Sequence, residues 1–316
     1  MERNRVLGGI LGVVIGDALG LPVQFESREQ RRRRPVRGME GWGVFNMPPG
    51  SISDDGSLTL CLAESICEAG LNPQDSAERF LRWYQEGHWT PLGYAYDIGG
   101  STAQAMERLK RGIPAVEAGP AGENDNGNGS LMRILPAALY LAKSDVKDLA
   151  QGIWDMSRIT HGHPRACSAC YIYALLVREL LTGVSPDEAY HRLCSQPDDI
   201  LRPGIDAKER PHFQRILAGK LEQLPESEIR SSGYVVDTLE AAIWCLLKHN
   251  DFSSTLLAAV NMGDDTDTVG AVTGGLAGIV YGREGIPDEW LEVLLKGDEI
   301  MELANRFVDV ICGEHS

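Results

Sequence analysis

The sequence has few basic residues for its length, and this shortage argues against one broad class of function. Its 316 residues include 30 lysines and arginines against 45 aspartates and glutamates, giving a formal net charge of −15 at pH 7. Proteins that bind nucleic acid in general need a basic face to meet the phosphate backbone. We therefore expect no general nucleic-acid binding.

A disulfide framework is also missing. The seven cysteines are odd in number and scattered along the chain, which suits a reduced cytosol. Cys167-Ser-Ala-Cys170 is a lone CxxC inside a helical pattern. Because no second pair accompanies it, small buried helix residues are a better interpretation than a redox or zinc site.

Long apolar runs are absent as well. None reaches the roughly 18 residues that a membrane-spanning helix needs. The run from Val6 to Ile15 resembles the apolar part of a signal peptide, but it continues directly into Asp17 and lacks a clean cleavage site. We therefore predict that it forms the first helix of a cytoplasmic protein with no membrane association.

Alternating β-type stretches are hard to find, whereas helical periodicity recurs along most of the chain. No linker divides the sequence, so we predict a single all-α domain over residues 1–316. The connections over 21–56 and 112–129 exceed the usual loop length, which is typical of functional loops. The predicted helices cover residues 3–20, 57–69, 75–86, 98–111, 130–143, 147–158, 165–182, 186–194, 208–219, 234–249, 253–262, 267–282 and 296–312.

Two of these helices carry glycine at every fourth residue. The first contains Gly8, Gly12, Gly16 and Gly20, and the late one contains Gly270, Gly274, Gly278 and Gly282. Four-residue spacing places each set near one helix face. Glycine inside a helix costs about 1 kcal/mol relative to alanine, so these glycines indicate close approach of another backbone or a ligand. Tight helix packing explains most of them.

The late helix is preceded by a dense acidic stretch, Gly263-Asp264-Asp265-Thr266-Asp267-Thr268. One interpretation is a helix N-cap, because Asp and Thr are good capping residues. A cap needs only one side chain, and like charges this close repel unless a cation offsets them. A metal site is therefore the favoured interpretation.

A second acidic cluster, Ser53-Asp54-Asp55, precedes another predicted helix. Alone it is typical of a helix cap. Together, the two clusters offer carboxylate and hydroxyl oxygens, which suit hard cations such as Mg²⁺, Mn²⁺ or Ca²⁺. Two such clusters could hold two ions about 4 Å apart.

Three further segments are ambiguous on their own. Asn126-Gly127-Asn128-Gly129-Ser130 is either a plain turn or an anion-binding loop before a helix. Asp97 either caps a helix or serves a site, and His161 in Thr160-His161-Gly162-His163 is either a polar loop residue or a ligand contact. The arginine run Arg31–Arg34 is expected to form a solvated loop, with contact to an anionic partner as the alternative.

Taken together, these segments resemble the ADP-ribosylglycohydrolase family, the group that includes the dinitrogenase-reductase-activating glycohydrolase. The resemblance extends from Gly9 to about Gly282 with the motifs in the family's order. Its N-terminal signature is similar to Gly16-Asp17-Ala18-Leu19-Gly20. The segments around Ser53-Asp54-Asp55, Tyr96-Asp97-Ile98-Gly99, Gly129–Arg133, Thr160-His161 and Gly263–Gly270 match the rest.

The resemblance implies a compact orthogonal bundle of about a dozen helices around a central site for two Mg²⁺ or Mn²⁺ ions. Its implied metal ligands are Ser53, Asp54, Asp55, Asp265, Asp267 and Thr268, with Asp264 outside the direct ligand set. It also implies diphosphate contact by Gly127, Asn128, Gly129, Ser130 and Met132. Asp97 becomes the acid/base candidate, and His161 is expected near the distal part of the ligand.

Two positions depart from the family's pattern. Ser53 stands where threonine is usual and keeps the hydroxyl. Gln24 stands where many members carry a glutamate, and glutamine cannot transfer a proton. Glu26 is a candidate substitute for that acid. With Asp97 present and Gln24 in place of the glutamate, the resemblance favours N-linked, arginine-type substrates over O-linked ones.

We therefore predict a metal-dependent hydrolase that releases ADP-ribose from a modified protein side chain, most plausibly arginine. Two alternatives stay open. One is a relative that binds ADP-ribose without turnover. The other is a hydrolase of a different ADP-ribosyl compound, such as an O-linked adduct, a nucleic-acid adduct or a small metabolite.

Overall fold

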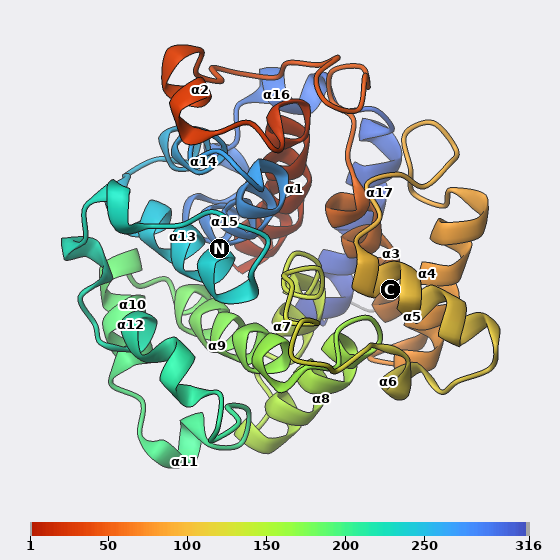
Figure 1. The fold of residues 1–316 in the computed structure, drawn as a ribbon, viewed down its shortest axis with the longest axis vertical. Coiled ribbons are helices and arrows are strands. Elements are labelled where there is room, and N and C mark those ends of the chain that lie inside the picture. The colour runs from red at the N-terminus through yellow and green to blue at the C-terminus, as the bar shows by residue number, and fades with distance from the viewer. Residues whose placement is uncertain (1, 314–316) are drawn as a thin grey trace.

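The structure, a computed structural model, describes residues 2–313 and is almost entirely helical in that range. Its only β-type pairing there is an isolated antiparallel bridge between Gly127 and Tyr234. The all-α fold class predicted from the sequence is confirmed. Figure 1 shows the helices packed at many angles to one another.

The elements have the following bounds. The α-helices are α1 Glu2–Gly20, α2 Arg28–Arg33, α3 Asp54–Ala69, α4 Pro73–Glu86, α5 Gly100–Lys110, α6 Ala115–Ala118, α7 Leu135–Tyr140, α8 Val146–Arg158, α9 Pro164–Leu181, α10 Pro186–Cys194, α11 Asp198–Leu201, α12 Gln214–Leu217, α13 Val235–Lys248, α14 Phe252–Val260, α15 Thr266–Tyr281, α16 Asp288–Glu292 and α17 Gly297–Cys312. Five 3₁₀ turns complete them: η1 Leu21–Val23, η2 Arg210–Phe213, η3 Leu221–Gln223, η4 Glu226–Glu228 and η5 Arg283–Gly285.

The centre of the fold is the pair α1 and α15, which lie side by side although they are far apart in sequence (Figure 1). Their glycines face each other backbone to backbone. A Cβ added at Gly12 would lie 2.1 Å from the carbonyl oxygen of Gly274, and one at Gly16 would lie 2.0 Å from that of Gly270. No side chain fits at such separations. The predicted interpretation of these glycines as helix packing is confirmed, and we call this contact the glycine seam.

The first helix is longer and more apolar than the run identified in the sequence. The segment Glu2–Val23 has the length and composition of a membrane span, which corrects the expectation that no segment reaches that length. However, 89% of its apolar window is buried inside the fold, as in a core helix. Its apolar character is therefore explained by packing against α15 and its neighbours.

The described residues form 17 α-helices, where about a dozen were expected. The four that sequence periodicity missed, α2, α6, α11 and α16, have only four to six residues each. Such segments are too short to show a helical repeat. The helix predicted over 130–143 is only α7, Leu135–Tyr140, so the glycine loop is followed by turns and not directly by a helix. Two other predicted starts were too late, since α3 begins at Asp54 and α15 at Thr266. The acidic motifs therefore lie within the first helical turns.

The arginine run was expected to form a solvated loop: Arg32, Arg33 and Arg34 are indeed exposed to solvent, but most of the run is helical. Residues 28–33 form α2, whose start is fixed by a capping box between Ser27 and Gln30. Arg31 is buried and pairs with Glu26. Arg28 donates hydrogen bonds to backbone carbonyls, including 2.8 Å to Met262 and 2.7 Å to Ile229. These two arginines hold the segment after η1 against the core.

Candidate metal and substrate site

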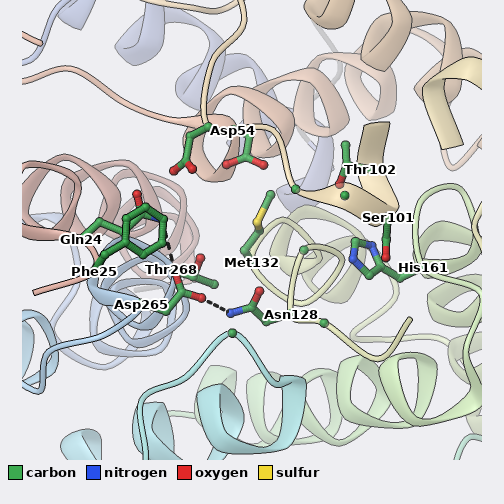
Figure 2. A pocket seen from close by; sticks show the side chains of 16 residues that line it. Gln24, Phe25, Asp54, Ser101, Thr102, Asn128, Met132, His161, Asp265 and Thr268 are labelled. Atoms are coloured by element: carbon green, nitrogen blue, oxygen red, sulfur yellow. Dashed lines mark hydrogen bonds between the residues drawn. The ribbon is translucent and has the colours of Figure 1, made fainter. Parts of the chain in front are cut away.

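A cavity of about 270 Å³ opens where α1, α3 and α15 meet the connection that contains Gly127–Gly129. Figure 2 shows Asp54, Gln24 and Asp265 toward one end, Met132 and Asn128 in the middle, and Ser101, Thr102 and His161 at the other end. None of the sixteen lining residues is lysine or arginine. They are Gln24, Phe25, Asp54, Asp97, Gly99, Gly100, Ser101, Thr102, Gly127, Asn128, Gly129, Met132, His161, Gly233, Asp265 and Thr268.

Behind the Asp54 end of the cavity lies a buried cluster of carboxylates. Oxygen atoms of Asp17, Asp55 and Asp267 all lie within 4.8 Å of one another, and the three side chains are at most 1% exposed. These residues come from α1, α3 and α15, three segments that are distant in sequence. The two acidic motifs recognised in the sequence are therefore brought together, and a third carboxylate joins them.

Asp17 is the cluster residue that sequence reasoning missed. Its carboxylate accepts hydrogen bonds from the backbone N–H of Ser53 at 2.9 Å and of Gly56 at 2.8 Å, at the start of α3. The N-terminal end of a helix stabilises a negative charge through its free N–H groups and its dipole. Asp17 thus fixes the first turn of α3 against α1. The sequence did contain a signal for Asp17, because it is a charged residue within the otherwise apolar second half of α1.

Hydroxyl groups tie the cluster together. Ser53 Oγ donates to Asp55 Oδ2 at 3.0 Å, and Thr268 Oγ1 donates to the same oxygen at 3.5 Å. The side chain of Ser53 also caps α3 by accepting the N–H of Asp55. The helix-cap interpretation therefore holds for Ser53. It fails for Asp265, which is the N-cap residue of α15 but makes no side-chain capping bond.

The pKa values of these carboxyl groups are raised. Burial is the largest cause for each, and it raises the pKa of Asp17 to about 7. The pKa values of Asp54, Asp55 and Asp267 lie well above the ordinary value, because burial is reinforced by repulsion from neighbouring aspartates. Such a cluster is costly when it is ionised and unpaired.

The residues fit a divalent cation. Oδ1 of Asp55 and Oδ2 of Asp267 are buried atoms without a hydrogen-bond partner among the described residues. Buried carboxylate oxygens without partners are expensive, and a bound cation would satisfy them. The donors are all oxygen, which is the ligand type preferred by Mg²⁺ and Mn²⁺.

The remaining predicted ligands, Asp54, Asp265 and Thr268, line the cavity itself. Beside them, the amide of Gln24 lies 3.4 Å from Asp265 Oδ1. Asp264, which was placed outside the direct ligand set, is exposed and does not line the cavity. Its backbone pairs with residues 25 and 26, accepting from the N–H of Phe25 at 2.6 Å and donating to the carbonyl of Glu26 at 2.7 Å.

The glycine loop forms the opposite wall of the cavity. The backbone N–H groups of Gly127, Gly129 and Ser130 have no hydrogen-bond partner among the described residues. Gly127 and Gly129 line the cavity, so their N–H groups are available to an anion. The N–H of Asn128 is already used by the carbonyl of Gly233 at 3.1 Å. Gly129 packs directly against the ring of His161, and an added Cβ at this position would lie 2.6 Å from that ring.

Two residues predicted to contact phosphate have other side-chain partners. The hydroxyl of Ser130 is fully buried against Ser157 and Cys170, and the residue does not line the cavity, so its contact with phosphate stays a prediction from the sequence. The amide of Asn128 donates to Asp265 and to Thr238. It therefore links the glycine loop to the acidic cluster. Met132 lines the cavity as expected.

His161 lies at the cavity end remote from Asp54 (Figure 2). Burial lowers the pKa of its imidazole to about 3, so the ring is neutral. Arg133 donates to Thr160 Oγ1 at 2.7 Å, and the Thr160 hydroxyl lies 3.0 Å from Nδ1 of His161. Because Arg133 is only a donor, the Thr160 hydroxyl is free to donate to Nδ1. This arrangement favours the tautomer with a proton on Nε2, the nitrogen nearer the glycine loop.

Asp97 also lines the cavity, and it does not cap α5. The N-cap residue of α5 is Gly99, whereas Asp97 has a left-handed backbone with a φ of 53°. Burial raises the pKa of its carboxyl, although hydrogen bonds with Asp267 and Gln24 offset part of the rise. A raised carboxyl pKa is the property expected of a group that exchanges protons with a substrate.

Glu26 does not take the place that its sequence position suggested. Its carboxylate pairs with Arg31, and the residue does not line the cavity. An acid must come within hydrogen-bond reach of the atom that it protonates. The structure gives no such position to Glu26, and its catalytic role remains only a prediction from the sequence.

Comparison with known proteins identifies relatives over the whole chain. A sequence model of the family described as ADP-ribosylglycohydrolase matches residues 1–316. A protein named ADP-ribosylarginine hydrolase Tri1 from Pseudomonas putida is 35% identical over 314 residues, which cover 97% of this chain and 78% of that protein. The ADP-ribosyl-[dinitrogen reductase] glycohydrolase of Rhodospirillum rubrum is 32% identical, covering 92% of this chain and 90% of that protein.

A solved structure supports the same relationship. The structure titled ADP-ribosylglycohydrolase-related protein complex superimposes with a TM-score of 0.78 at 35% sequence identity. The match covers 98% of each chain. The similarity therefore includes the cavity and the segments that form it.

Proposed function

Because this chain belongs to the ADP-ribosylglycohydrolase family, we propose that it is a metal-dependent enzyme that hydrolyses the N-glycosidic bond between ADP-ribose and a protein arginine. The names of its relatives support an ADP-ribosyl glycohydrolase, and two of them specify arginine or a modified protein. Metal dependence, linkage and the protein nature of the substrate are the parts of the proposal that need testing.

One observation carries the proposal: the cavity combines a carboxylate cluster with an anion-binding loop. The cluster of Asp17, Asp55 and Asp267 suits cations, and the free N–H groups of Gly127 and Gly129 suit a diphosphate. ADP-ribose has ribose hydroxyls to place near the cations and a diphosphate to place at the loop.

We propose that two Mg²⁺ or Mn²⁺ ions are held by Ser53, Asp54, Asp55, Asp265, Asp267 and Thr268, with Asp17 joining them. When bound, the ions would neutralise the cluster and orient the ribose hydroxyls beside the scissile bond. Asp54, Asp265 and Thr268 reach the cavity, whereas Asp55 and Asp267 lie behind it. The first group would therefore shape the ribose side of the site.

The other residues have roles that follow from their positions. Asp97 would exchange the proton that must move when water adds to the ribose carbon and the bond to the arginine nitrogen breaks. Gly127 and Gly129 would donate backbone N–H groups to the diphosphate. His161 would donate from Nε2, because its Nδ1 accepts from Thr160.

The linkage specificity rests on Gln24. Its amide lies beside Asp265 and Asp97, at the place where many family members carry glutamate. An amide cannot supply a proton to an oxygen leaving group, whereas an N-linked arginine needs no acid as strong, because a guanidine holds a proton readily. This chemistry favours an arginine linkage.

The proposal is tested by incubating the protein with an arginine-ADP-ribosylated protein and measuring free ADP-ribose by mass spectrometry. We expect release with Mg²⁺ or Mn²⁺ and none with EDTA. A panel of serine-linked and nucleic-acid-linked ADP-ribose tests the linkage in the same assay. Tight binding of ADP-ribose without release from any substrate would contradict the enzymatic proposal.

A further inference from the structure

Phe25, which lines the cavity, is one of a set of exposed apolar side chains on segments that lead into the cavity wall. The described chain has eight large hydrophobic residues that are strongly exposed, and five of them belong to segments next to this cavity. These five are between 47% and 66% exposed. We call them the apolar rim: Phe25, Trp42, Val44, Leu92 and Tyr94.

Ring and side-chain contacts connect the two main segments of the rim. Phe25 lies 6.4 Å from Phe45 between ring centroids, Phe45 lies 5.8 Å from Tyr96, and Tyr96 lies 6.1 Å from Tyr94. The hydroxyl of Tyr94 is 3.9 Å from the sulfur of Met47. The connection between α2 and α3 and the connection between α4 and α5 therefore meet, and both lie on one side of the molecule in Figure 1.

The backbone at the rim is held in an unfavourable conformation. Phe25 and Trp42 have φ angles of 66° and 68°, the left-handed region that bulky residues rarely adopt. Hydrogen bonds maintain it, from the N–H of Phe25 to Asp264 at 2.6 Å and from the N–H of Trp42 to Met47 at 2.6 Å. Strain of this kind clusters where function requires a particular side-chain placement. Here it accompanies two aromatic side chains that are exposed to solvent.

Apart from Phe25, the rim residues lie on segments without charged side chains. Residues 41–53 and 89–96 contain no Asp, Glu, Lys or Arg, although these residues make up 24% of the whole chain. Large exposed apolar patches mark sites of interaction, and aromatic residues without nearby charge are typical of interface centres. A partner that matches this surface must therefore offer an apolar patch of its own.

The position of the rim indicates which partner this is. Phe25 lines the cavity and is 66% exposed, so the wall of the cavity continues directly into the rim. A cavity of about 270 Å³ cannot enclose a protein, so a modified side chain that enters it leaves its polypeptide outside, at the mouth. A second copy of this chain is disfavoured as the occupant, because each copy carries a net charge of −15.

We propose that the apolar rim is the docking surface for the polypeptide of the ADP-ribosylated protein, which presents an apolar patch beside its modified arginine. This inference rests on the proposed function. It explains why the enzyme would bind ADP-ribose on a protein more tightly than free ADP-ribosyl-arginine. The cavity recognises ADP-ribose, and the rim recognises the protein that carries it. Affinity for the two parts of the substrate is therefore separable by mutation.

The test compares two substrates and two rim variants, Trp42→Asn and Leu92→Ser. Neither residue lines the cavity, and Asn is well suited to the left-handed backbone at position 42. Tyr140→Ser, which removes an exposed aromatic residue outside the rim, is the matched control. Dissociation constants and kcat/KM are measured for an arginine-ADP-ribosylated protein and for free ADP-ribosyl-arginine.

We expect each rim variant to bind the modified protein roughly 5- to 30-fold more weakly, as for an interface anchor. Values for free ADP-ribosyl-arginine should not change, and the control should match wild type. Equal effects on both substrates, or no effect on either, would overturn the proposal. So would a wild-type dimer that the rim variants convert to a monomer in sedimentation measurements.

The same measurements separate this inference from the proposed function. If wild type binds both substrates but cleaves neither, the proposed activity fails, and the rim is still judged by the binding ratios. If wild type cleaves free ADP-ribosyl-arginine and the variants lose no affinity for the modified protein, only the rim proposal fails. If wild type binds neither substrate, both proposals fail.

Discussion

Nδ2 of Asn128 donates a hydrogen bond of 2.6 Å to Oδ2 of Asp265, which joins the glycine loop to the acidic cluster. The same amide donates to Thr238 at 2.9 Å, so the side chain is fixed from two sides. The ribose and diphosphate halves of the proposed site are therefore not independent. A substitution in one half should alter ligand binding in the other.

Asn128→Ala tests this connection. It leaves Asp265 and Thr238 without a shared donor, and loss of a buried hydrogen bond to a charged group costs about 1.5–3 kcal/mol. We expect a lower free energy of unfolding by urea and weaker binding of both Mn²⁺ and ADP-ribose in calorimetry. Weakened ADP-ribose binding with unchanged Mn²⁺ binding would show that the two halves are separate.

Asp17→Asn tests the residue that the sequence did not single out. Asn preserves the shape and one hydrogen-bond acceptor toward α3, but it removes a negative charge from the cluster. We expect Mn²⁺ affinity to fall by at least roughly tenfold, with the fold retained. Asp264→Asn is the matched control, since that side chain is exposed and its φ of 60° suits Asn. Equal Mn²⁺ affinity in the two variants would exclude Asp17 from the ion site.

The metal-free protein should lose stability as pH rises from about 5 to 7.5. The pKa of Asp17 is 3.8 when unperturbed and about 7 in the fold, so folding takes up a proton between these values. The stabilising protonated form is therefore lost as pH rises through 7. Saturating Mg²⁺ should reverse the trend, because the ion replaces the protons. Melting temperatures in EDTA and in Mg²⁺ across this range provide the measurement.

Two histidines oppose this trend, His161 and His249, because burial also lowers the pKa of His249. The pKa of His161 falls to about 3 in the fold, so its contribution to stability is lost as pH falls below about 6.5. The Asp17→Asn variant retains both histidines, and the difference between wild type and variant therefore reports Asp17 together with its repulsion of Asp54, Asp55 and Asp267. If both proteins show the same pH profile in EDTA, Asp17 does not titrate in this range.

Asp97→Asn should separate catalysis from binding. Asn accommodates the left-handed backbone at this position, so the cavity wall should keep its shape. Because the amide cannot exchange a proton, we expect turnover to fall by roughly 10²- to 10⁴-fold. The dissociation constant of ADP-ribose should change little. Comparable losses in turnover and binding would make Asp97 a binding residue instead.

Gly12→Ala should disrupt the glycine seam. The new Cβ would overlap the backbone of Gly274, and overpacking of this kind costs about 1–3 kcal/mol or more. We expect a lower melting temperature together with weaker Mn²⁺ binding, since the seam positions both α1 and α15. Gly297→Ala in the first turn of α17 is the control, because its Cβ would meet only ordinary contacts beyond 3.5 Å. A stable Gly12→Ala variant would show that the helices can separate without cost.

The sequence was informative wherever a motif was local. The all-α class, most helix positions and the two acidic motifs followed from periodicity and from carboxylates crowded before apolar helices. The ligand set implied by the resemblance also falls into two spatial groups around one cavity, with Asp54, Asp265 and Thr268 at its surface. Local chemistry of this kind does not depend on how distant segments pack.

What the sequence could not supply were relationships between distant segments. Asp17 becomes part of the cluster only because the glycine seam brings α1 against α15. The diversion of Asn128 toward Asp265 and of Ser130 toward the core depends on neighbours that are at least 27 residues away. The rim was invisible for the same reason, because exposure is a property of the folded surface.

The glycine seam also imposes an order of events on synthesis of the protein. α1 leaves the ribosome before α15, which follows roughly 250 residues later. At typical translation rates this interval lasts on the order of 10 to 50 s. During that time a segment with the composition of a membrane span has no partner to cover it. The apolar face of α1 therefore needs temporary cover, from other helices or from a chaperone, until α15 has been made.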